Sequence, residues 1–191
     1  SHAVAMKAHF DKWIGNEVIE WSVPWPTTEP RADLHHDQFV EWRRLKRYFN
    51  NCGVVMRRDR FKAVGGYDET QLRRHDFVLF MEVIHGHRWA FNPKSEMKIR
   101  MDTPGSISRS IVSCAYYRVR GLRRVQQRYD HPALNAEITD ESATAISLAT
   151  LRGSQEDRRM AWELCGTCLR PRDKWMLRLT TWWPAMYRML H

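Results

Sequence analysis

The sequence predicts an α/β protein with a helical extension at its C-terminus. Residues 53–93 show the order strand, helix, helix, strand, which is typical of α/β domains. With 191 residues, 43% of them apolar, the chain is long enough to bury a core. From about residue 106 onward the pattern is mainly helical. We therefore predict one domain at 1–130 and a helical extension at 131–191.

The N-terminal third combines one expected strand with two expected helices. Residues 3–14 are interpreted as the end of a helix, and residues 17–23 alternate like a strand. Three prolines within residues 24–33 indicate an irregular connection. Residues 37–49 place aromatic side chains at helical spacing and arginines opposite them, which predicts an amphipathic helix with a basic face. That face is either solvated or an anion-binding surface.

The central part gives the order on which the fold class depends. "CGVVMRR" predicts a short buried strand, and residues 59–64 predict a short helix with Asp59 as its cap. Gly65 and Gly66 are expected to end this helix, because glycine accepts the left-handed backbone of a C-terminal cap. Apolar residues from Phe77 onward mark a buried helix that stops at Gly86, and a strand follows up to Pro93.

Four helices are expected in the C-terminal half. The first ends at Tyr129, the second covers residues 140–151, the third covers residues 154–168, and the fourth runs from Arg172 to the C-terminus. The pair of cysteines in "CGTC", at 165 and 168, has redox-motif spacing but lacks the preceding strand of a thioredoxin-like site. Two thiols in a helical segment are the preferred interpretation.

The charge balance favours an anionic partner. The chain has 31 basic and 22 acidic residues, a net charge of +9 and a pI near 9.7. A nucleotide diphosphate, an acidic lipid surface or a nucleic acid would suit it. Nucleic acid is not expected, because the basic residues are spread over several helices. No apolar stretch approaches the ~20 residues of a membrane span. We expect a cytoplasmic protein, associated at most with a membrane surface.

Residues 50–110 carry four motifs in a specific order. They are "NNCGVVMRRDRFKAVGGYDE", "HDFVLFMEVIHG", "HRWAFNP" and "IRMDTPGSISRS". Together they resemble the acceptor-side half of family 2 glycosyltransferases, which have the GT-A fold. The resemblance implies a partial GT-A, Rossmann-like sheet. It also implies an inverting transfer of a sugar from a nucleotide-diphosphate donor to a hydroxyl of a glycan, a lipid-linked molecule or a small molecule.

The resemblance assigns roles to four consecutive residues. Asp76 matches the second acid of the family's "ED" pair and would act as the general base, because an alcohol is a poor nucleophile until its proton is removed. The competing interpretation is that Asp76 caps its helix. Arg73, Arg74 and His75 would contact the acceptor or the diphosphate. His75 stands where the family has its first acid, and it cannot supply a fixed negative charge.

Metal binding is implied only by the resemblance. Asp102 is a conceivable ligand for magnesium or manganese, which prefer oxygen ligands, although the start of a turn before Pro104 is the preferred interpretation. The family's donor-binding half ends in a D-x-D motif, and this chain contains none. We expect either a fragment of a longer enzyme, a non-catalytic remnant, or a missing half supplied from elsewhere. The chain alone is expected to be inactive.

The C-terminal segment 172–191 predicts an amphipathic helix. It is the pattern of a helix lying in the interface of an anionic membrane, or of one docked against the core. The apolar face comprises Trp175, Leu179, Trp182, Trp183, Met186 and Leu190, and the cations are Arg172, Lys174, Arg178 and Arg188. A non-catalytic, basic module that binds a membrane surface or nucleic acid is therefore the alternative to an enzyme.

Overall fold

The computed structural model describes residues 5–14, 17–19, 31–34, 53–100, 103–104 and 110–182. The chain divides into two compact units, each with its own internal contacts. Unit 1 comprises Ser1–Glu69 and His75–Ser106, and unit 2 comprises Thr70–Arg74 and Ile107–His191. The predicted helix at residues 37–49 lies outside the described residues.

The predicted α/β, Rossmann-like fold is wrong, because the described part of the chain is mainly helical. Its six α-helices contain more than twice as many residues as its strands. A Rossmann-like sheet consists of parallel strands joined by helical crossovers. Here the strands form a small mixed sheet, in which three of the four described pairings are antiparallel.

The sheet of unit 1 explains why the strand-helix-helix-strand order was misleading. Its strands are β1 (Ala5–Ile14), β2 (Glu17–Ile19), β3 (Arg31–Leu34), β4 (Val54–Met56) and β5 (Trp89–Arg100). The strand order is β2-β1-β5-β3, and β4 pairs with β1. Both β4 and β5 pair with β1, but β4 runs antiparallel to it and β5 runs parallel to it. The two helices between β4 and β5 therefore do not form a parallel βαβ crossover.

Strand β1 corrects the helix that was expected at residues 3–14. Met6, Ala8 and Phe10 alternate with Lys7, His9 and Asp11, and this period of two is that of a strand. The alternation gains its stability from distant partners, since β1 pairs with the residues of β5 from Ala90 to Arg100. Such partners are invisible in a local window of sequence.

The helix before the double glycine forms as predicted, within one residue. Helix α2 (Arg58–Ala63) ends in a Schellman motif, in which the Gly66 N–H donates to the carbonyl of Phe61 and the Gly65 N–H donates to that of Lys62, both at 3.0 Å. Both glycines have positive φ, 90° and 70°. Asp59 does not cap α2. It accepts two bonds from the Arg57 guanidinium instead, at 3.1 and 2.7 Å.

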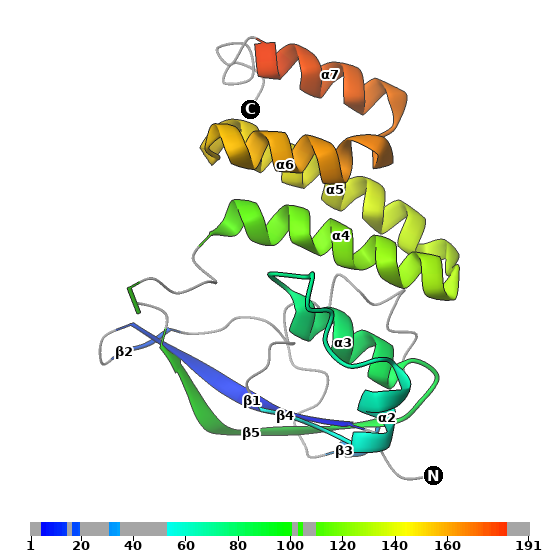
Figure 1. Cartoon of the computed structure of the whole chain (residues 1–191). Coiled ribbons are helices and arrows are strands. Elements are labelled where there is room, and N and C mark those ends of the chain that lie inside the picture. Colours follow the sequence, from blue (N-terminus) through cyan, green and yellow to red (C-terminus); the bar gives the residue numbers. More distant parts are fainter. Residues whose placement is uncertain are drawn as a thin grey trace. The chain divides into compact units, whose positions relative to one another are not determined.

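Helix α3 (His75–Ile84) is buried on every side from Phe77 onward. Its Phe80 ring meets the Trp89 ring of β5 edge-on, with centroids 5.9 Å apart, and Trp89 in turn meets Phe91. In Figure 1, α2 and α3 lie on the same face of the sheet. The helix ends before Gly86, as the sequence predicts. This apolar layer between α3 and β5 forms the core of unit 1.

Unit 2 is a stack of helices (Figure 1). It contains α4 (Ile111–Tyr129), α5 (Pro132–Arg152), α6 (Gln155–Cys165), the short 3-10 helix η2 (Gly166–Cys168) and α7 (Pro171–Trp182). Val119, Leu122, Leu134, Ala145 and Ile146 are fully buried and form its core. None of the described helices has the length and apolar character needed to span a membrane.

Two helix starts in unit 2 differ in how well local sequence predicted them. Helix α6 begins at the expected place, because Ser154 and Asp157 form a capping box. Helix α5 begins eight residues before the expected start at 140. Pro132 occupies its first position, where the missing N–H costs nothing, and the His131 ring nitrogen Nδ1 accepts from the Ala133 N–H at 3.3 Å.

Candidate functional site

The four predicted site residues from Arg73 to Asp76 lie at the division between the two units. Arg73 and Arg74 belong to unit 2, whereas His75 and Asp76 begin α3 in unit 1. Arg74 has φ of 60°, a left-handed conformation that costs a non-glycine residue roughly 1–2 kcal/mol. The chain therefore turns sharply, against its local preference, between the two arginines and the helix that carries the predicted base.

Asp76 lies in the first turn of α3 and is only half-buried. Its Oδ1 accepts a hydrogen bond from the Phe77 N–H at 2.8 Å. The carboxylate thereby satisfies one of the backbone N–H donors at the helix start that would otherwise lack a partner. The carboxylate thus has a local structural role while it remains accessible to solvent, which is what both the capping role and the base role require.

Two side chains of unit 1 form the immediate surroundings of Asp76. The Tyr67 ring packs edge-on against the His75 imidazole, with centroids 5.3 Å apart, and Phe61 packs edge-on against the other side of Tyr67 at 5.8 Å. Burial raises the pKa of Tyr67 above its ordinary value, and the negative charge of Asp76 raises it further. A phenol, an imidazole and a carboxylate therefore gather at the start of α3. We call Tyr67, His75 and Asp76 the α3 cluster.

Arg73 acts on a different part of the chain. Its backbone carbonyl accepts from the Gln71 Nε2 at 2.9 Å, and the same nitrogen donates to the Tyr117 carbonyl of α4 at 2.5 Å. Arg120 of α4 donates to Thr70 at 2.7 Å. The segment Thr70–Arg74 is thus attached to α4 within unit 2.

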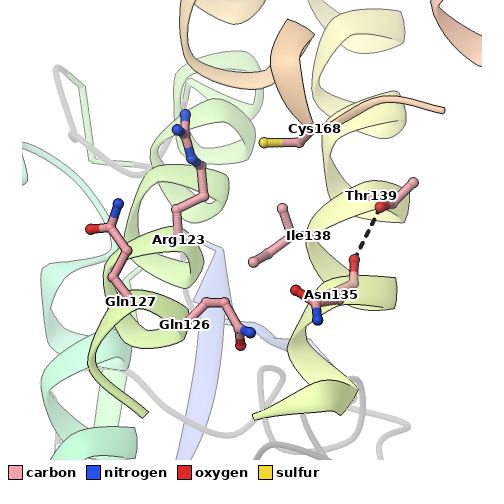
Figure 2. A pocket seen from close by; sticks show the side chains of 7 residues that line it. All are labelled: Arg123, Gln126, Gln127, Asn135, Ile138, Thr139 and Cys168. Atoms are coloured by element: carbon pink, nitrogen blue, oxygen red, sulfur yellow. Dashed lines mark hydrogen bonds between the residues drawn. The ribbon is translucent and has the colours of Figure 1, made fainter. Parts of the chain in front are cut away.

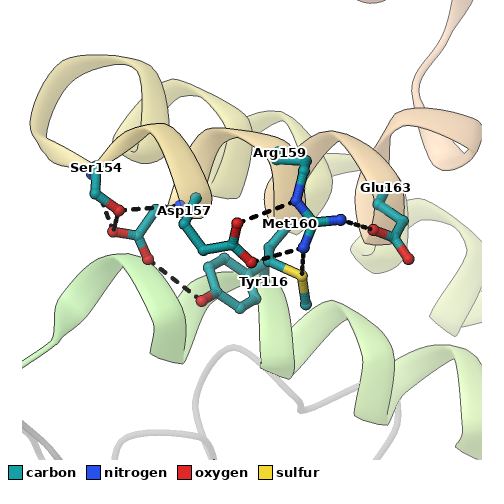
Figure 3. Close-up of polar contacts among 7 residues, drawn as sticks. Tyr116, Ser154, Asp157, Arg159, Met160 and Glu163 are labelled. Carbon is teal, nitrogen blue, oxygen red and sulfur yellow. Dashed lines mark hydrogen bonds and ion pairs between the residues drawn. The ribbon is translucent and has the colours of Figure 1, made fainter.

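The positive charge of Arg73 acts on Asp157, which belongs to a polar network between α4 and α6. Figure 3 shows this network. The Tyr116 hydroxyl donates to Asp157 Oδ1 at 3.3 Å, and the Ser154 hydroxyl donates to Oδ2 at 2.8 Å. Burial of Asp157 favours a higher pKa. The bonds from Ser154 and Tyr116 and the positive charge of Arg73 outweigh it, so the pKa of Asp157 lies below its ordinary value. Arg73 therefore favours the ionised form of Asp157 within unit 2.

The described residues contain neither the predicted metal ligand nor a group of side chains that could bind a metal. Asp102 lies outside them. In the part of the chain that the structure describes, no group of three or more His, Cys, Asp or Glu side chains could hold a metal ion. The magnesium or manganese that the resemblance implies therefore stays a prediction, and we derive no chemical step through a metal.

Unit 2 contains a pocket that the sequence did not indicate (Figure 2). It has a volume of about 310 Å³ and opens between α4, α5 and η2. Its lining comprises Arg123, Gln126, Gln127, Asn135, Ile138, Thr139 and Cys168. Three amides and a hydroxyl contribute to this lining, beside the apolar side chain of Ile138. Among these residues, Cys168 belongs to "CGTC" and Arg123 to a run of arginines, whereas amides at helical spacing carry no signal of a pocket.

Arg123 holds one wall of this pocket in place. Its Nη1 donates to the Leu164 carbonyl at 3.1 Å, near the C-terminal end of α6, where a cation is favourable. The thiol of Cys165 behind this wall is fully buried. Burial, and secondly the neighbouring Cys168, raise the pKa of Cys165 to about 12, although Arg123 opposes the shift. A thiolate at Cys165 is thus strongly disfavoured, which agrees with two structural thiols in a helical segment and not with a redox pair.

The C-terminal helix presents its predicted tryptophan to solvent. Trp175 of α7 is 68% exposed and Met176 is 49% exposed, whereas Leu177 is buried. Arg178 lies over the Trp162 ring of α6, 6.0 Å from its centroid. Beyond Arg178, the predicted face lies outside the residues whose side chains are described.

Comparison of the chain with protein-family models, curated proteins and solved structures finds no match. The resemblance of residues 50–110 to family 2 glycosyltransferases therefore stays a prediction.

Proposed function

We propose that this chain is the acceptor-side part of an inverting, nucleotide-sugar-dependent glycosyltransferase, with Asp76 as the base that activates the acceptor hydroxyl. The observation that carries the proposal is the α3 cluster. It places an accessible carboxylate at the start of a rigid, buried helix, beside a tyrosine and a histidine. Further support comes from the ordered motifs of residues 50–110, because "VGGYDE" and "HDF" supply the members of this cluster.

The chemistry assigned to Asp76 is a single proton transfer. As the acceptor oxygen attacks the anomeric carbon of the donor, the bond from that carbon to the nucleoside diphosphate breaks and the configuration inverts. The proton of the acceptor hydroxyl passes to the carboxylate, since an alcohol cannot attack efficiently while it keeps its proton. Rigid placement of the base matters as much as its basicity, and the burial of α3 from Phe77 to Ile84 supplies that rigidity.

His75 and Tyr67 can orient the acceptor without sharing the proton transfer. An imidazole and a phenol both donate and accept hydrogen bonds, and the hydroxyls of a sugar or a lipid-linked acceptor need both. We do not assign this role to Arg73, because its charge acts on Asp157. Donor binding is assigned to no described residue.

The test compares two aspartates that each lie in the first turn of a helix. Asp76→Asn keeps the size and capping ability of the side chain but cannot take up a proton, so sugar transfer by the natural full-length protein should fall by roughly 10²–10⁴-fold. Transfer is measured with a panel of nucleotide-sugar donors and hydroxyl acceptors. Asp173→Asn is the control, since Asp173 lies in the first turn of α7.

Two results would reject the proposal. The first is undiminished transfer by Asp76→Asn. The second is the absence of any transfer by the natural protein across the donor panel. A loss of folded protein in Asp76→Ala, seen by circular dichroism, together with undiminished transfer by Asp76→Asn, would assign the carboxylate to helix capping instead.

A further inference from the structure

Helix α7 carries exposed apolar and cationic side chains on one face. Arg172, Trp175 and Met176 have the spacing i, i+3, i+4 and therefore lie on the same side of the helix. All three are exposed. Leu177 is buried on the opposite side, flanked by the half-buried Asp173 and Lys174. We call Arg170, Arg172, Trp175 and Met176 the α7 surface.

The burial pattern shows that this arrangement is not a core face. A helix docked through its tryptophan would bury Trp175 and expose Leu177, and the structure shows the reverse. Of the seven large apolar side chains that are exposed in the described part of the chain, Trp175 has the highest exposed fraction. Trp175 and Met176 are neighbours, so they form a continuous apolar patch.

The cations around this patch are available for an anionic partner. Residues 170–178 contain four basic residues and one acidic residue. Arg178 is engaged with the Trp162 ring, whereas Arg170 and Arg172 are exposed and form no ion pair with another described residue. Two arginines that lack an ion pair among the described residues, beside an exposed tryptophan, favour binding to an anionic surface that also accepts apolar groups.

We infer that the α7 surface binds the headgroup region of an anionic lipid membrane. Tryptophan prefers the interface between water and acyl chains, and methionine beside it adds apolar area at the same depth. Arg170 and Arg172 would then contact lipid phosphates, each adding attraction that depends on anionic lipid. This inference is independent of the proposed glycosyl transfer, because it involves no residue of the α3 cluster.

A lipid surface fits this face better than a nucleic acid does. Nucleic-acid binding relies on many phosphate contacts along one element, and this surface offers two unpaired arginines beside its apolar patch. The combination of two large apolar side chains with a few cations is instead that of an interfacial helix.

The test is co-sedimentation of the whole chain with vesicles of phosphatidylcholine alone and of phosphatidylcholine mixed equally with phosphatidylglycerol. We expect binding to the anionic vesicles and little to the neutral ones. Arg170→Gln/Arg172→Gln should weaken that binding by about tenfold or more, and Trp175→Ala/Met176→Ala should also weaken it. All four side chains are exposed, so circular dichroism should show unchanged folding.

The matched control is Leu151→Ala/Arg152→Gln, which removes an exposed apolar residue and an exposed arginine at the end of α5. It should bind like the unaltered chain. Equal binding to neutral and anionic vesicles, an equal loss in the control, or no effect of either α7 variant would overturn the inference. The inference would also be overturned if the chain bound duplex DNA or single-stranded RNA through the same α7 residues and did not bind vesicles.

Discussion

The Tyr67 ring packs edge-on against the His75 imidazole, at a centroid distance of 5.3 Å and an interplanar angle of 82°. Tyr67 precedes α3 and His75 begins it, so the contact ties the glycine turn to the start of the helix that carries Asp76. This arrangement makes the ionisation of Tyr67 sensitive to the charge of Asp76.

Neutralising Asp76 should lower the pKa of Tyr67. Burial is the larger cause of the raised pKa, and the negative charge of Asp76 is the second, so Asp76→Asn should remove only the second part. The phenolate can be followed by ultraviolet difference absorption, with Tyr67→Phe subtracted to isolate this one tyrosine. If the Tyr67 titration is the same with and without the Asp76 charge, the carboxylate does not lie where the α3 cluster requires.

The double glycine should tolerate alanine unequally. Gly65→Ala places a side chain at φ of 90° in open space, and should reduce the free energy of unfolding by about 1 kcal/mol. At Gly66 the added Cβ would also lie 3.2 Å from the Phe61 ring, so Gly66→Ala should cost more, about 2 kcal/mol. Urea unfolding of both variants gives the comparison. Equal losses would mean that Phe61 moves aside without cost.

The segment from α2 to α3 was predictable because its determinants are local. Strand β4 is the exception: it pairs with the distant β1, and Val55 is 62% exposed, so it is not the buried strand that the sequence predicts. The Schellman glycines, the start of α3 and its end before Gly86, by contrast, follow from residues within a few positions of one another. The Ser154 capping box that starts α6 is local in the same way. At each of these places, a hydrogen bond between near neighbours decides the structure.

The larger failures involve partners that are distant in sequence, whereas the missed start of α5 has local determinants at His131 and Pro132. Strand β1 becomes a strand through its pairing with β5, more than 80 residues away. The segment Thr70–Arg74 adjoins the predicted base in sequence, yet it is fixed to α4 by Gln71 and Arg120. The same holds for the arginines of α4. A run of arginines at helical spacing is typical of a solvated face, but Arg118, Arg120 and Arg123 each donate to a residue outside α4.

Arg118 should stabilise unit 2 more than an exposed arginine does. Its Nη1 lies 2.7 Å from Glu141 Oε2, and the Glu141 side chain is only 5% exposed. Arg118→Met removes the guanidinium and leaves that carboxylate buried, which should cost about 3 kcal/mol in urea unfolding. Arg118→Met/Glu141→Leu should recover part of the loss, because it removes the buried charge as well.

The control for this prediction is the pair Arg159–Glu156, whose side chains are 62% and 66% exposed. Arg159→Met should change the stability little, because solvent screens an exposed pair and its side chains lose entropy when they meet. A loss in Arg118→Met no greater than in Arg159→Met would show that the α4–α5 ion pair is not a major stabilising contact.

Ionisation of Tyr116 should reduce the stability of unit 2 at alkaline pH. Burial is the largest cause that raises the pKa of Tyr116; together with the negative charge of Asp157 and the hydrogen bond between the two side chains, it brings the pKa from 10.0 to about 12. The folded chain therefore favours the protonated phenol. Its contribution to stability is fully present below about pH 10 and is lost as the pH rises to about 12. Tyr116→Phe cannot ionise, so its stability should fall less steeply over this range. Urea unfolding at several pH values gives both curves, and lysines cancel in their difference because both proteins contain the same ones. Parallel curves between pH 10 and 12 would contradict the burial of the Tyr116 hydroxyl against Asp157.

On the acid side the sign of the pH dependence is opposite, because the pKa of Asp157 lies below its ordinary value. The stability that Asp157 provides is present above pH 3.8 and is lost as the pH falls below it, and Asp157→Asn should remove that acid dependence.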